Sequence, residues 1–408
     1  MHVVDDGAGG GGGGHVMPTM NCAHIQKAKV NAAATADKST FFFLILCSIS
    51  RTSPLVVITI QKKQAARHDA APAMASCLSS SLFRRLAVLQ LAVAATLSLT
   101  LGGAQAQLQY DYYSETCPGV EDLVREALLA KFADDVTLPA SLLRLHFHDC
   151  FAAGCDATIM LKSHNGTAQR DADPNATVRG YEAIEDVKAK VEESCPLTVS
   201  CADIMAMAAR DAVNFTKGPA YQVETGRRDG NVSRKEDAER SLPPADGNVT
   251  VLTRFFAAQN LSMKDMTVLS AAHTIGVAHC SSFSQRLYNY TGAGDQDPAL
   301  DPEFAKNLTA VCKPEHMASV QPLDQASPTT FDTGYFQSVY NHRALLASDA
   351  ALLEDSFTAP YVTLMATNAS YAPTFFQDFS VSMLKMGRIA VRTGTDGEIR
   401  ATCAIYVD

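Results

Sequence analysis

The stretch RLHFHDCFAAGCDAT, which begins at Arg144, holds the residues whose types and spacing are best suited to chemistry. Arg144 and His148 are four residues apart, so a helix places a fixed cation and a titratable base on one face, one turn from each other. Such a pair can bind a peroxide and split it. Asp149, Asp156 and Thr158 add hard oxygen donors of the kind that bind Ca²⁺. The stretch therefore predicts peroxide chemistry beside a cation site.

Helices must position these side chains, and the apolar pattern of the chain predicts them. Val120, Val124 and Leu128 recur at helical spacing, whereas strand signals are few and short. No internal repeat or linker is evident within 107–408, so we expect one α-rich unit there. The expected helices cover residues 120–132, 140–151, 181–194, 200–214, 251–259, 263–273, 302–312, 333–347 and 371–388.

Charge divides the chain near residue 106. Residues 1–106 hold 9 of the 34 Lys and Arg and 4 of the 43 Asp and Glu, a balance of +5. Residues 107–408 hold the remaining 25 and 39, a balance of −14. An acidic folded part argues against nucleic acid or an anionic membrane as a partner, because both require a basic surface.

Residues 74–106 have the pattern of a secretory signal peptide. Arg84 and Arg85 precede a short apolar stretch, and the A-Q-A sequence that ends at Ala106 is typical of a cleavage site. A membrane anchor is the alternative, but the apolar stretch is short and ends in small residues. We expect the mature chain to begin at Gln107, to be exported and to keep no membrane segment.

Residues 1–73 differ from the rest, with a run of glycines and a broken apolar patch. A signal peptide normally stands at the very N-terminus, so this segment is expected to be an upstream extension of the gene model. A genuine but disordered leader is the alternative. Residues 107–408 are then the functional domain.

The cysteines agree with export. Eight of the 11 cysteines follow the predicted cleavage site, and an even number in an exported chain suggests four disulfides. Their spacing alone leaves roughly a hundred pairings open. Nine N-x-S/T sequons also lie after the cleavage site, which is typical of a secreted glycoprotein.

Several motifs together resemble the secretory plant (class III) haem peroxidases. The stretch at Arg144 resembles their distal-haem helix, and LSAAHTIG, which contains His273, resembles their proximal-haem helix. PNATVRGY, which contains Asn175, resembles their distal loop, and SCADI and GRRD also match. The resemblance covers essentially all of 107–408 in the family's order. It implies an all-α, two-lobed haem peroxidase fold with one haem b between the distal and proximal helices.

The resemblance also implies roles for single residues. His148 acts as general base and then general acid, Arg144 stabilises the leaving oxygen, and Asn175 holds the His148 ring. His273 is the axial ligand of the haem iron, and Asp349 holds its second nitrogen. The distal haem neighbour is Phe147, and Pro243 lies at the substrate edge of the haem.

Two Ca²⁺ sites and one disulfide pattern are implied in the same way. The distal calcium ligands are Asp149, Ala152, Gly154, Asp156 and Thr158. The proximal calcium ligands are Thr274, Asp324, Ser327, Thr330 and Asp332. The disulfides are Cys117–Cys195, Cys150–Cys155, Cys201–Cys403 and Cys280–Cys312.

The implied function is that of a secreted peroxidase of the cell wall or apoplast. It reduces hydrogen peroxide to water and oxidises small phenols in one-electron steps, with a role in lignin or suberin metabolism and in the oxidative stress response. A monomer is expected. Gln169 stands where the family usually has Glu, Ala271 where it has Gly, and Tyr221 where it has Trp. Gln169 leads us to expect weaker calcium binding and a looser tie to His148.

Two other hypotheses follow from the same residues. One is a catalytically weak, wall-associated, calcium-binding glycoprotein, for which Gln169 is the main argument. The other is a disulfide-rich extracellular calcium module without haem, which the apolar helices around His148 and His273 fit poorly. Haem absorbance separates the module from the other two hypotheses, and turnover separates the enzyme from the weak glycoprotein.

Overall fold

A computed structural model describes residues 108–407 of the chain. The chain divides into a unit of residues Met1–Ala87 and a unit of residues Val88–Asp408, and every described residue belongs to the second. The predicted leader, signal peptide and cleavage site lie outside the described residues. Within the described part, none of the helices combines the length and the apolar character that crossing a membrane requires.

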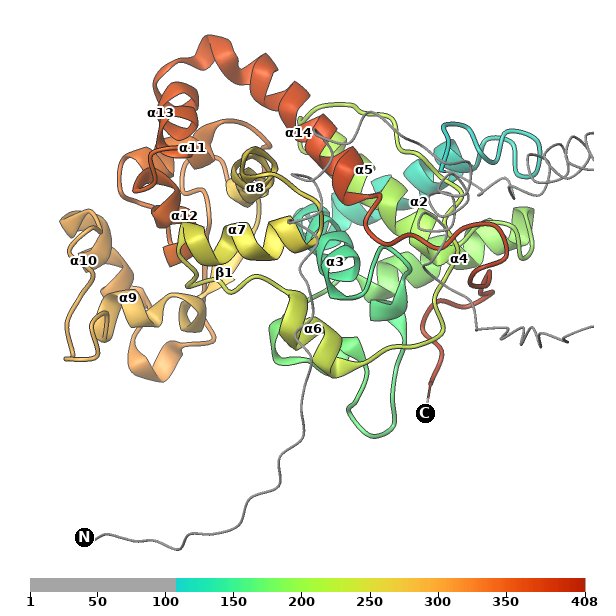
Figure 1. The fold of residues 1–408 in the computed structure, drawn as a ribbon, viewed down its shortest axis with the longest axis horizontal. Helices are drawn as coiled ribbons and strands as arrows, with labels where there is room; N and C mark the ends of the chain where they lie inside the picture. The colour runs from blue at the N-terminus through green and yellow to red at the C-terminus, as the bar shows by residue number, and fades with distance from the viewer. Residues whose placement is uncertain (1–107, 408) are drawn as a thin grey trace, which may run out of the picture. The chain divides into compact units, whose positions relative to one another are not determined.

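The described residues are mainly helical, which confirms the all-α prediction (Figure 1). The two strands, β1 (Val277–His279) and β2 (Val320–Pro322), form one antiparallel pair. The helices are α2 (Val120–Asp134), α3 (Leu138–Ala152), α4 (Tyr181–Ser194), α5 (Cys201–Phe215), α6 (Lys235–Ser241), α7 (Val249–Ala258), α8 (Met263–Ser270), α9 (Ser284–Tyr288), α10 (Pro302–Val311), α11 (Gly334–Tyr340), α12 (Ala347–Ala350), α13 (Ala359–Thr367) and α14 (Ala372–Met386).

Two of the expected helices are wrong in detail. The helix expected at 333–347 is two helices, α11 and α12, because the chain turns at His342, whose φ of 59° is left-handed and cannot continue an α-helix. The helix expected at 263–273 stops at Ser270, and His273 lies on the following 3₁₀ turn, Ala271–Thr274. The short helices α6, α9 and α13 were not predicted. Each has at most nine residues, which gives little periodic signal.

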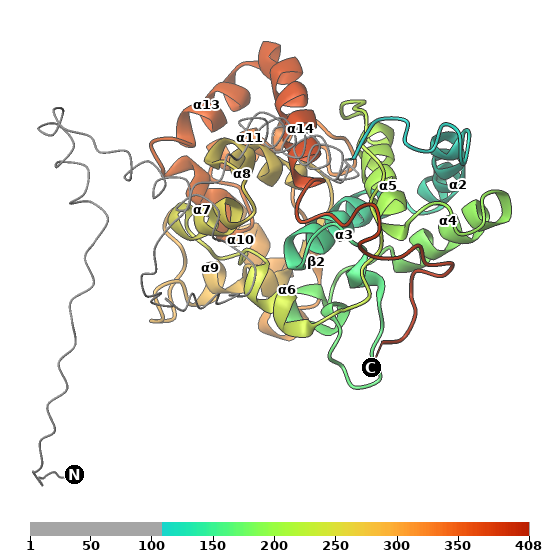
Figure 2. The same ribbon diagram turned by 45° about the vertical axis from the view of Figure 1, so that its right-hand side comes forward.

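Two main apolar cores form the two lobes. One is built from α2, α4, α5 and one side of α3, and includes Leu142 and Leu145. The other is built from α7, α8, α11, α13 and α14, together with Leu143 and Phe151 from the other side of α3. Both views show α3 between these groups of helices (Figures 1 and 2). The helix that carries Arg144 is therefore fixed from both sides.

Four disulfides form, and they are the four pairs that the resemblance implied. Cys117–Cys195, Cys150–Cys155, Cys201–Cys403 and Cys280–Cys312 join residues 78, 5, 202 and 32 positions apart. The widest joins the start of α5 to the C-terminal segment. The narrowest closes the loop directly after α3, which holds the predicted distal calcium donors.

Candidate active site

Helix α3 presents Arg144 and His148 one turn apart, as their spacing predicted. The Arg144 Nε–H donates to His148 Nε2 over 3.1 Å. His148 Nδ1 lies 2.6 Å from Asn175 Oδ1, which comes from the distal loop 27 residues further along the chain. Since Asn175 Oδ1 can only accept, His148 carries its proton on Nδ1 and keeps Nε2 as an acceptor.

The distal loop is held in part by its own backbone. Asn175 Nδ2 donates to the backbone oxygen of Gln169 over 2.6 Å, so the Gln169 side chain is not needed to orient Asn175. The side chain turns toward Thr158 instead, whose hydroxyl donates to Gln169 Oε1 over 3.2 Å. Asn175 is only 2% exposed. A side chain buried in this way has no room for a glycan, although Asn175 begins a sequon.

Electrostatics keep His148 neutral. Burial and, to a smaller extent, the positive charge of Arg144 lower the pKa of His148 to about 3, although the hydrogen bond that His148 donates to Asn175 Oδ1 acts in the opposite direction. The ring is therefore an uncharged acceptor at any pH above this value. Burial also lowers the pKa of Arg144 below its usual value, but the guanidinium stays charged.

Arg144 is fixed by groups that the sequence did not reveal. Its guanidinium donates to the backbone oxygens of Pro174 and Thr177, both over 3.1 Å, and to the Thr177 hydroxyl over 3.0 Å. The ring of Phe147 meets the ring of His148 edge to face, with centroids 5.3 Å apart. The cation and the base therefore have set positions beside an aromatic ring. Backbone acceptors have no sequence signature, so only the structure could identify them.

His273 lies on the short turn after α8, and its Nδ1 is 3.0 Å and 3.1 Å from the two carboxylate oxygens of Asp349. Tyr335, a residue that the sequence reasoning missed, donates its hydroxyl to Asp349 Oδ1 over 2.9 Å. Burial lowers the pKa of His273, but the charge and hydrogen bond of Asp349 outweigh it, so the net pKa is raised. Asp349 is therefore set to hold the ring from its Nδ1 side.

These residues fit a haem. Among the described residues, none hydrogen-bonds to Nε2 of His273, and the side chain is 37% exposed, so this nitrogen is available to an iron. The charge of Arg144 also lowers the pKa of His273, so the distal and proximal groups act on each other across the space between them. A histidine that binds a metal through one ring nitrogen usually donates a hydrogen bond from the other ring nitrogen to an acceptor such as a carboxylate.

The predicted distal calcium donors are buried, and one of them, Asp156, accepts a hydrogen bond from Arg392 Nε over 3.1 Å. Asp149 is fully buried and accepts hydrogen bonds from the backbone N–H groups of Ala157 and Ile159. Burial and the charge of Asp156 raise the pKa of Asp149 well above its usual value. A divalent cation would offset both effects and keep the carboxylates ionised.

Two glycines let the chain pack closely around the predicted distal calcium donors. Gly154 has a φ of 124°, and a Cβ there would clash with the backbone of Ala390. Gly230 packs against Asp156 and Thr158 so closely that any side chain would displace them. Ala152 is the last residue of α3, where backbone oxygens lack helical partners. Carboxylate, hydroxyl and carbonyl oxygens are thus available to one cation.

The predicted proximal donors also converge. Ser327 donates its hydroxyl to Asp324 over 3.1 Å and to Asp332 over 2.9 Å. Thr274 directly follows His273, and its hydroxyl donates to Asp332 over 3.2 Å. No lysine, arginine or histidine between residues 108 and 407 forms an ion pair with either carboxylate. Two carboxylates and two hydroxyls without a cationic side chain suit Ca²⁺, with Thr330 in the same segment.

The predicted substrate-edge residue lies on a loop that reaches the proximal segment. Pro243 is partly exposed between α6 and α7. Two residues further on, the backbone oxygen of Ala245 accepts a hydrogen bond from the N–H of Ser348 over 3.0 Å. Ser348 precedes Asp349, so this loop is tied directly to the residue that holds His273.

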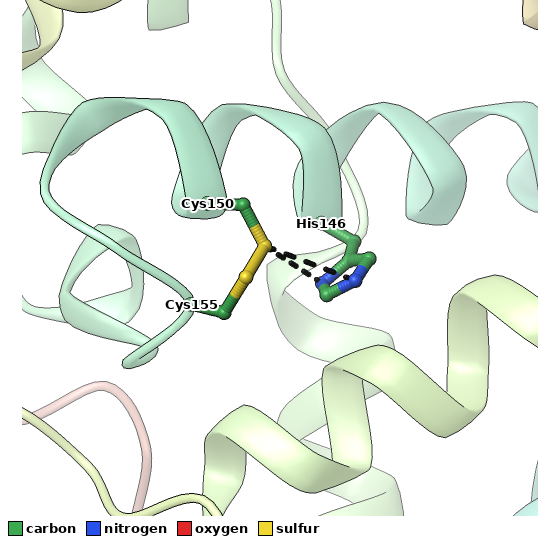
Figure 3. Close-up of side chains that lie close together, drawn as sticks. All are labelled: His146, Cys150 and Cys155. Carbon is green, nitrogen blue, oxygen red and sulfur yellow. Dashed lines mark hydrogen bonds between the residues drawn. A yellow bond between two sulfur atoms is a disulfide. The ribbon is translucent and has the colours of Figure 1, made fainter. Parts of the chain in front are cut away.

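One further cluster with metal-binding residue types is not a metal site. His146 lies within 3.8 Å of the Cys150 sulfur, and Cys155 completes the group. Both sulfurs are joined in a disulfide, as Figure 3 shows, so neither can serve as a thiolate ligand. Burial and the charge of Arg227 lower the pKa of His146 to about 3. His146 is therefore a neutral core residue on the far side of α3 from the chemistry.

The sequence matches the protein family described as Peroxidase over residues 124–368, which include every distal and proximal residue named above. It is 46% identical over 307 residues to Peroxidase 3 of Arabidopsis thaliana, which covers 75% of this chain and 94% of that protein. It is 46% identical over 327 residues to Peroxidase 1 of Oryza sativa subsp. japonica, and the match covers 79% of this chain and 98% of that protein. Peroxidase 30 of Arabidopsis thaliana is 42% identical over 322 residues, with 78% and 97% covered.

Proposed function

Because the chain belongs to the secretory plant (class III) peroxidase family, we propose that Arg144, His148 and Asn175 carry its reaction on one side of a haem, with His273 and Asp349 on the other. The protein is a peroxidase, which takes hydrogen peroxide and a reductant as its substrates. The observation that carries the assignment is the chain of contacts from Arg144 Nε to His148 Nε2 and from His148 Nδ1 to Asn175 Oδ1.

The three distal residues divide the proton and charge work. His148 Nε2 takes a proton from one oxygen of hydrogen peroxide and returns it to the other, which leaves as water. Its low pKa of about 3 keeps it unprotonated before the reaction. Asn175 fixes the tautomer, so the proton is always taken at Nε2. Arg144 stabilises the negative charge that develops on the departing oxygen.

The proximal residues hold the cofactor that the family implies. His273 Nε2 would bind the iron, and Asp349 would hold the ring and increase its donor strength. When bound, haem supplies the iron that binds peroxide and the electrons that reduce it. Tyr335 positions Asp349 by its hydrogen bond. One haem b per chain is proposed, because the described part brings together one such pair of histidines.

We further propose two bound Ca²⁺ ions, small phenols as reductants and a monomeric protein in the cell wall space. Two observations support the calcium proposals: the distal carboxylates are buried, and the proximal carboxylates converge on Ser327 without an ion pair to any described residue. Pro243 and the partly buried Phe147 would contact the reductant. A role in lignin or suberin metabolism and in oxidative stress follows from the substrate class. Gln169 holds Asn175 through its backbone oxygen, a contact that a Glu at this position would make equally well, and this favours the enzyme over the catalytically weak glycoprotein.

The test is to express the full-length chain in a secreting plant or insect host with haem available. We expect a mature protein that begins at Gln107, carries two calcium ions by elemental analysis, and has a Soret band that responds to hydrogen peroxide and recovers with a phenol. A Soret band that ignores peroxide would refute the distal assignment. Folded protein without a Soret band would refute the haem proposal and leave the calcium module.

A further inference from the structure

A cationic side chain from the C-terminal segment contacts the predicted distal calcium site. Arg392 Nε donates to Asp156 Oδ2 over 3.1 Å, although the two residues are 236 positions apart. The Asp156 side chain is only 2% exposed, so the guanidinium reaches a buried carboxylate. Within residues 108–407, the other carboxylate of the site, Asp149, forms no ion pair and accepts only from backbone N–H groups. Arg392 therefore acts on one of the two charges that would hold the calcium ion.

The backbone brings Arg392 to this site. The N–H of Arg228 donates to the backbone oxygen of Arg392 over 2.9 Å, and the two residues form an isolated antiparallel bridge. Two positions after Arg228, the N–H of Gly230 donates to the backbone oxygen of Asp156 over 2.8 Å. Residues 228–230 therefore bind both the segment that carries Arg392 and the loop that carries Asp156. The contact between the two side chains follows from this backbone arrangement, since both ends are fixed to the same short segment.

A second carboxylate shares the Arg392 guanidinium. Arg392 Nη1 donates to Asp396 Oδ1 over 2.9 Å. The Asp396 side chain is 67% exposed, so the guanidinium joins a buried carboxylate to one at the surface. Water and salt screen the surface pair strongly, and the charge of Asp396 cancels only part of the field of Arg392 at the buried site. Asp396 also gives Arg392 a partner to keep when it turns away from Asp156.

The other groups around Asp156 leave the balance of charge to Arg392. Thr158 donates its hydroxyl to Asp156 Oδ1 over 2.6 Å, and the same hydroxyl contacts the neutral amide of Gln169. A second arginine, Arg400, lies nearby, but its guanidinium donates to two backbone oxygens and lies closest to a different carboxylate. Among the described residues, Arg392 is therefore the basic side chain that forms an ion pair with a predicted distal calcium ligand.

We propose that Arg392 competes with Ca²⁺ for Asp156 and so sets the calcium affinity of the distal site. A guanidinium on one oxygen of this carboxylate offsets part of the charge that attracts the ion, and it repels a divalent ion bound to the other oxygen. In protein stripped of calcium, Arg392 keeps the buried carboxylate paired, because an unpaired buried charge is costly. The inference rests on the distal calcium site of the proposed function and adds how that site is regulated. The distal loop then keeps its structure at calcium concentrations too low to fill the site.

The first experiment is calorimetric titration of the full-length, haem-loaded protein with calcium chloride, after a chelator has removed bound calcium. Asp156→Asn identifies the distal binding step, because this change should weaken that step and spare the proximal one. Arg392→Gln keeps an N–H donor but loses the charge, so we expect the distal step to become about tenfold tighter. Asp396→Asn should weaken the distal step several-fold, because the charge of Arg392 is then less balanced. Arg388→Gln, which removes an arginine paired with Glu224 over 2.6 Å, is the matched control and should bind calcium like the unchanged protein.

Thermal unfolding gives a second readout that does not depend on activity. With chelator present, Arg392→Gln should unfold at a lower temperature than the unchanged protein, and saturating calcium should raise its unfolding temperature by more. A distal affinity of Arg392→Gln that is unchanged or weaker would overturn the proposal. An unchanged affinity in Asp396→Asn, a surface change that leaves the core intact, would overturn it as well. If no binding step is sensitive to Asp156→Asn, the distal calcium site itself is refuted together with this inference. Peroxide turnover is measured separately and reports on the proposed reaction alone.

Discussion

Replacing Asn175 by valine tests the proposed distal chemistry most directly. Asn175 Oδ1 is 2.6 Å from His148 Nδ1, and both side chains are buried, with 2% and 6% of their surfaces exposed. Valine keeps most of the volume but accepts no hydrogen bond. His148 Nδ1–H then has no partner, and the ring is free to place its proton on Nε2, where it cannot act as a base.

The structure sets the size of the effect. Leaving a buried donor without an acceptor costs about 1–3 kcal/mol. If that cost falls on the tautomer with a free Nε2, the rate constant for the reaction with peroxide falls roughly 5–150-fold. The hydrogen bond that His148 donates to Asn175 Oδ1 also raises the pKa of His148, which stands at about 3. Its loss therefore moves the acid limb of the pH profile to lower pH, whereas Asn175→Asp, which adds a negative charge, moves it to higher pH.

Stopped-flow absorbance at the Soret band, with peroxide in excess and from pH 3 to pH 9, measures the rate constant of Asn175→Val and the acid limb of Asn175→Asp, which moves up into this range. Asn341→Val, at an exposed asparagine, is the control and should match the unchanged protein. The Soret spectrum before mixing shows whether haem is still bound. An Asn175→Val protein with normal haem and a rate within twofold of the unchanged protein, together with an Asn175→Asp acid limb that does not move, would refute the reasoning.

Three further outcomes are expected. Asp349→Asn removes the charge beside His273 and should raise the reduction potential of the haem iron by roughly 60–130 mV in spectroelectrochemical titration; an unchanged potential would contradict the proximal assignment. Replacing Cys201 and Cys403 together by serine opens a 202-residue loop and should lower the free energy of unfolding, measured in urea, by about 5 kcal/mol. A decrease below about 1 kcal/mol would contradict the entropic account of this disulfide. Burial lowers the pKa of His146 from 6.5 to about 3, so the unfolded chain binds more protons than the folded chain between these values, and the free energy of unfolding falls as the pH falls through this window. His146→Leu should therefore recover roughly 3 kcal/mol of the stability that the unchanged protein loses between pH 7 and pH 4. If the free energy of unfolding of both proteins depends on pH in the same way, the prediction is wrong.

Most of what could be predicted about the helices came from patterns in the local sequence. The i, i+4 spacing of Arg144 and His148 was enough to place both on one face of α3, because a helix repeats every 3.6 residues. The periodic segments at α2 and α4 were found with correct starts for the same reason. Short helices such as α6 were not predicted, because fewer than two full turns show no clear period in the sequence.

Contacts between distant residues could be expected only through resemblance. Nothing in the local sequence links Asn175 to His148 or Asp349 to His273, which are separated by 27 and 76 positions. Tyr335, which holds Asp349, was not anticipated at all, because a tyrosine in an apolar helix has no pattern that distinguishes it from a core residue. Its role depends on the packing of α11 beside the proximal turn.

The sequence by itself determined the residue types, the helical faces and the export pattern, because these depend on neighbours within a few positions. Only the tertiary structure decided that the backbone oxygen of Gln169, and not its side chain, holds Asn175, and that Arg170 and Tyr181 have buried donors without partners among residues 108–407. Hydrogen-bond partners and burial are set by segments that meet after folding. A pKa near 3 for His148 likewise arises from burial and from Arg144, since a histidine in an open chain keeps its ordinary value.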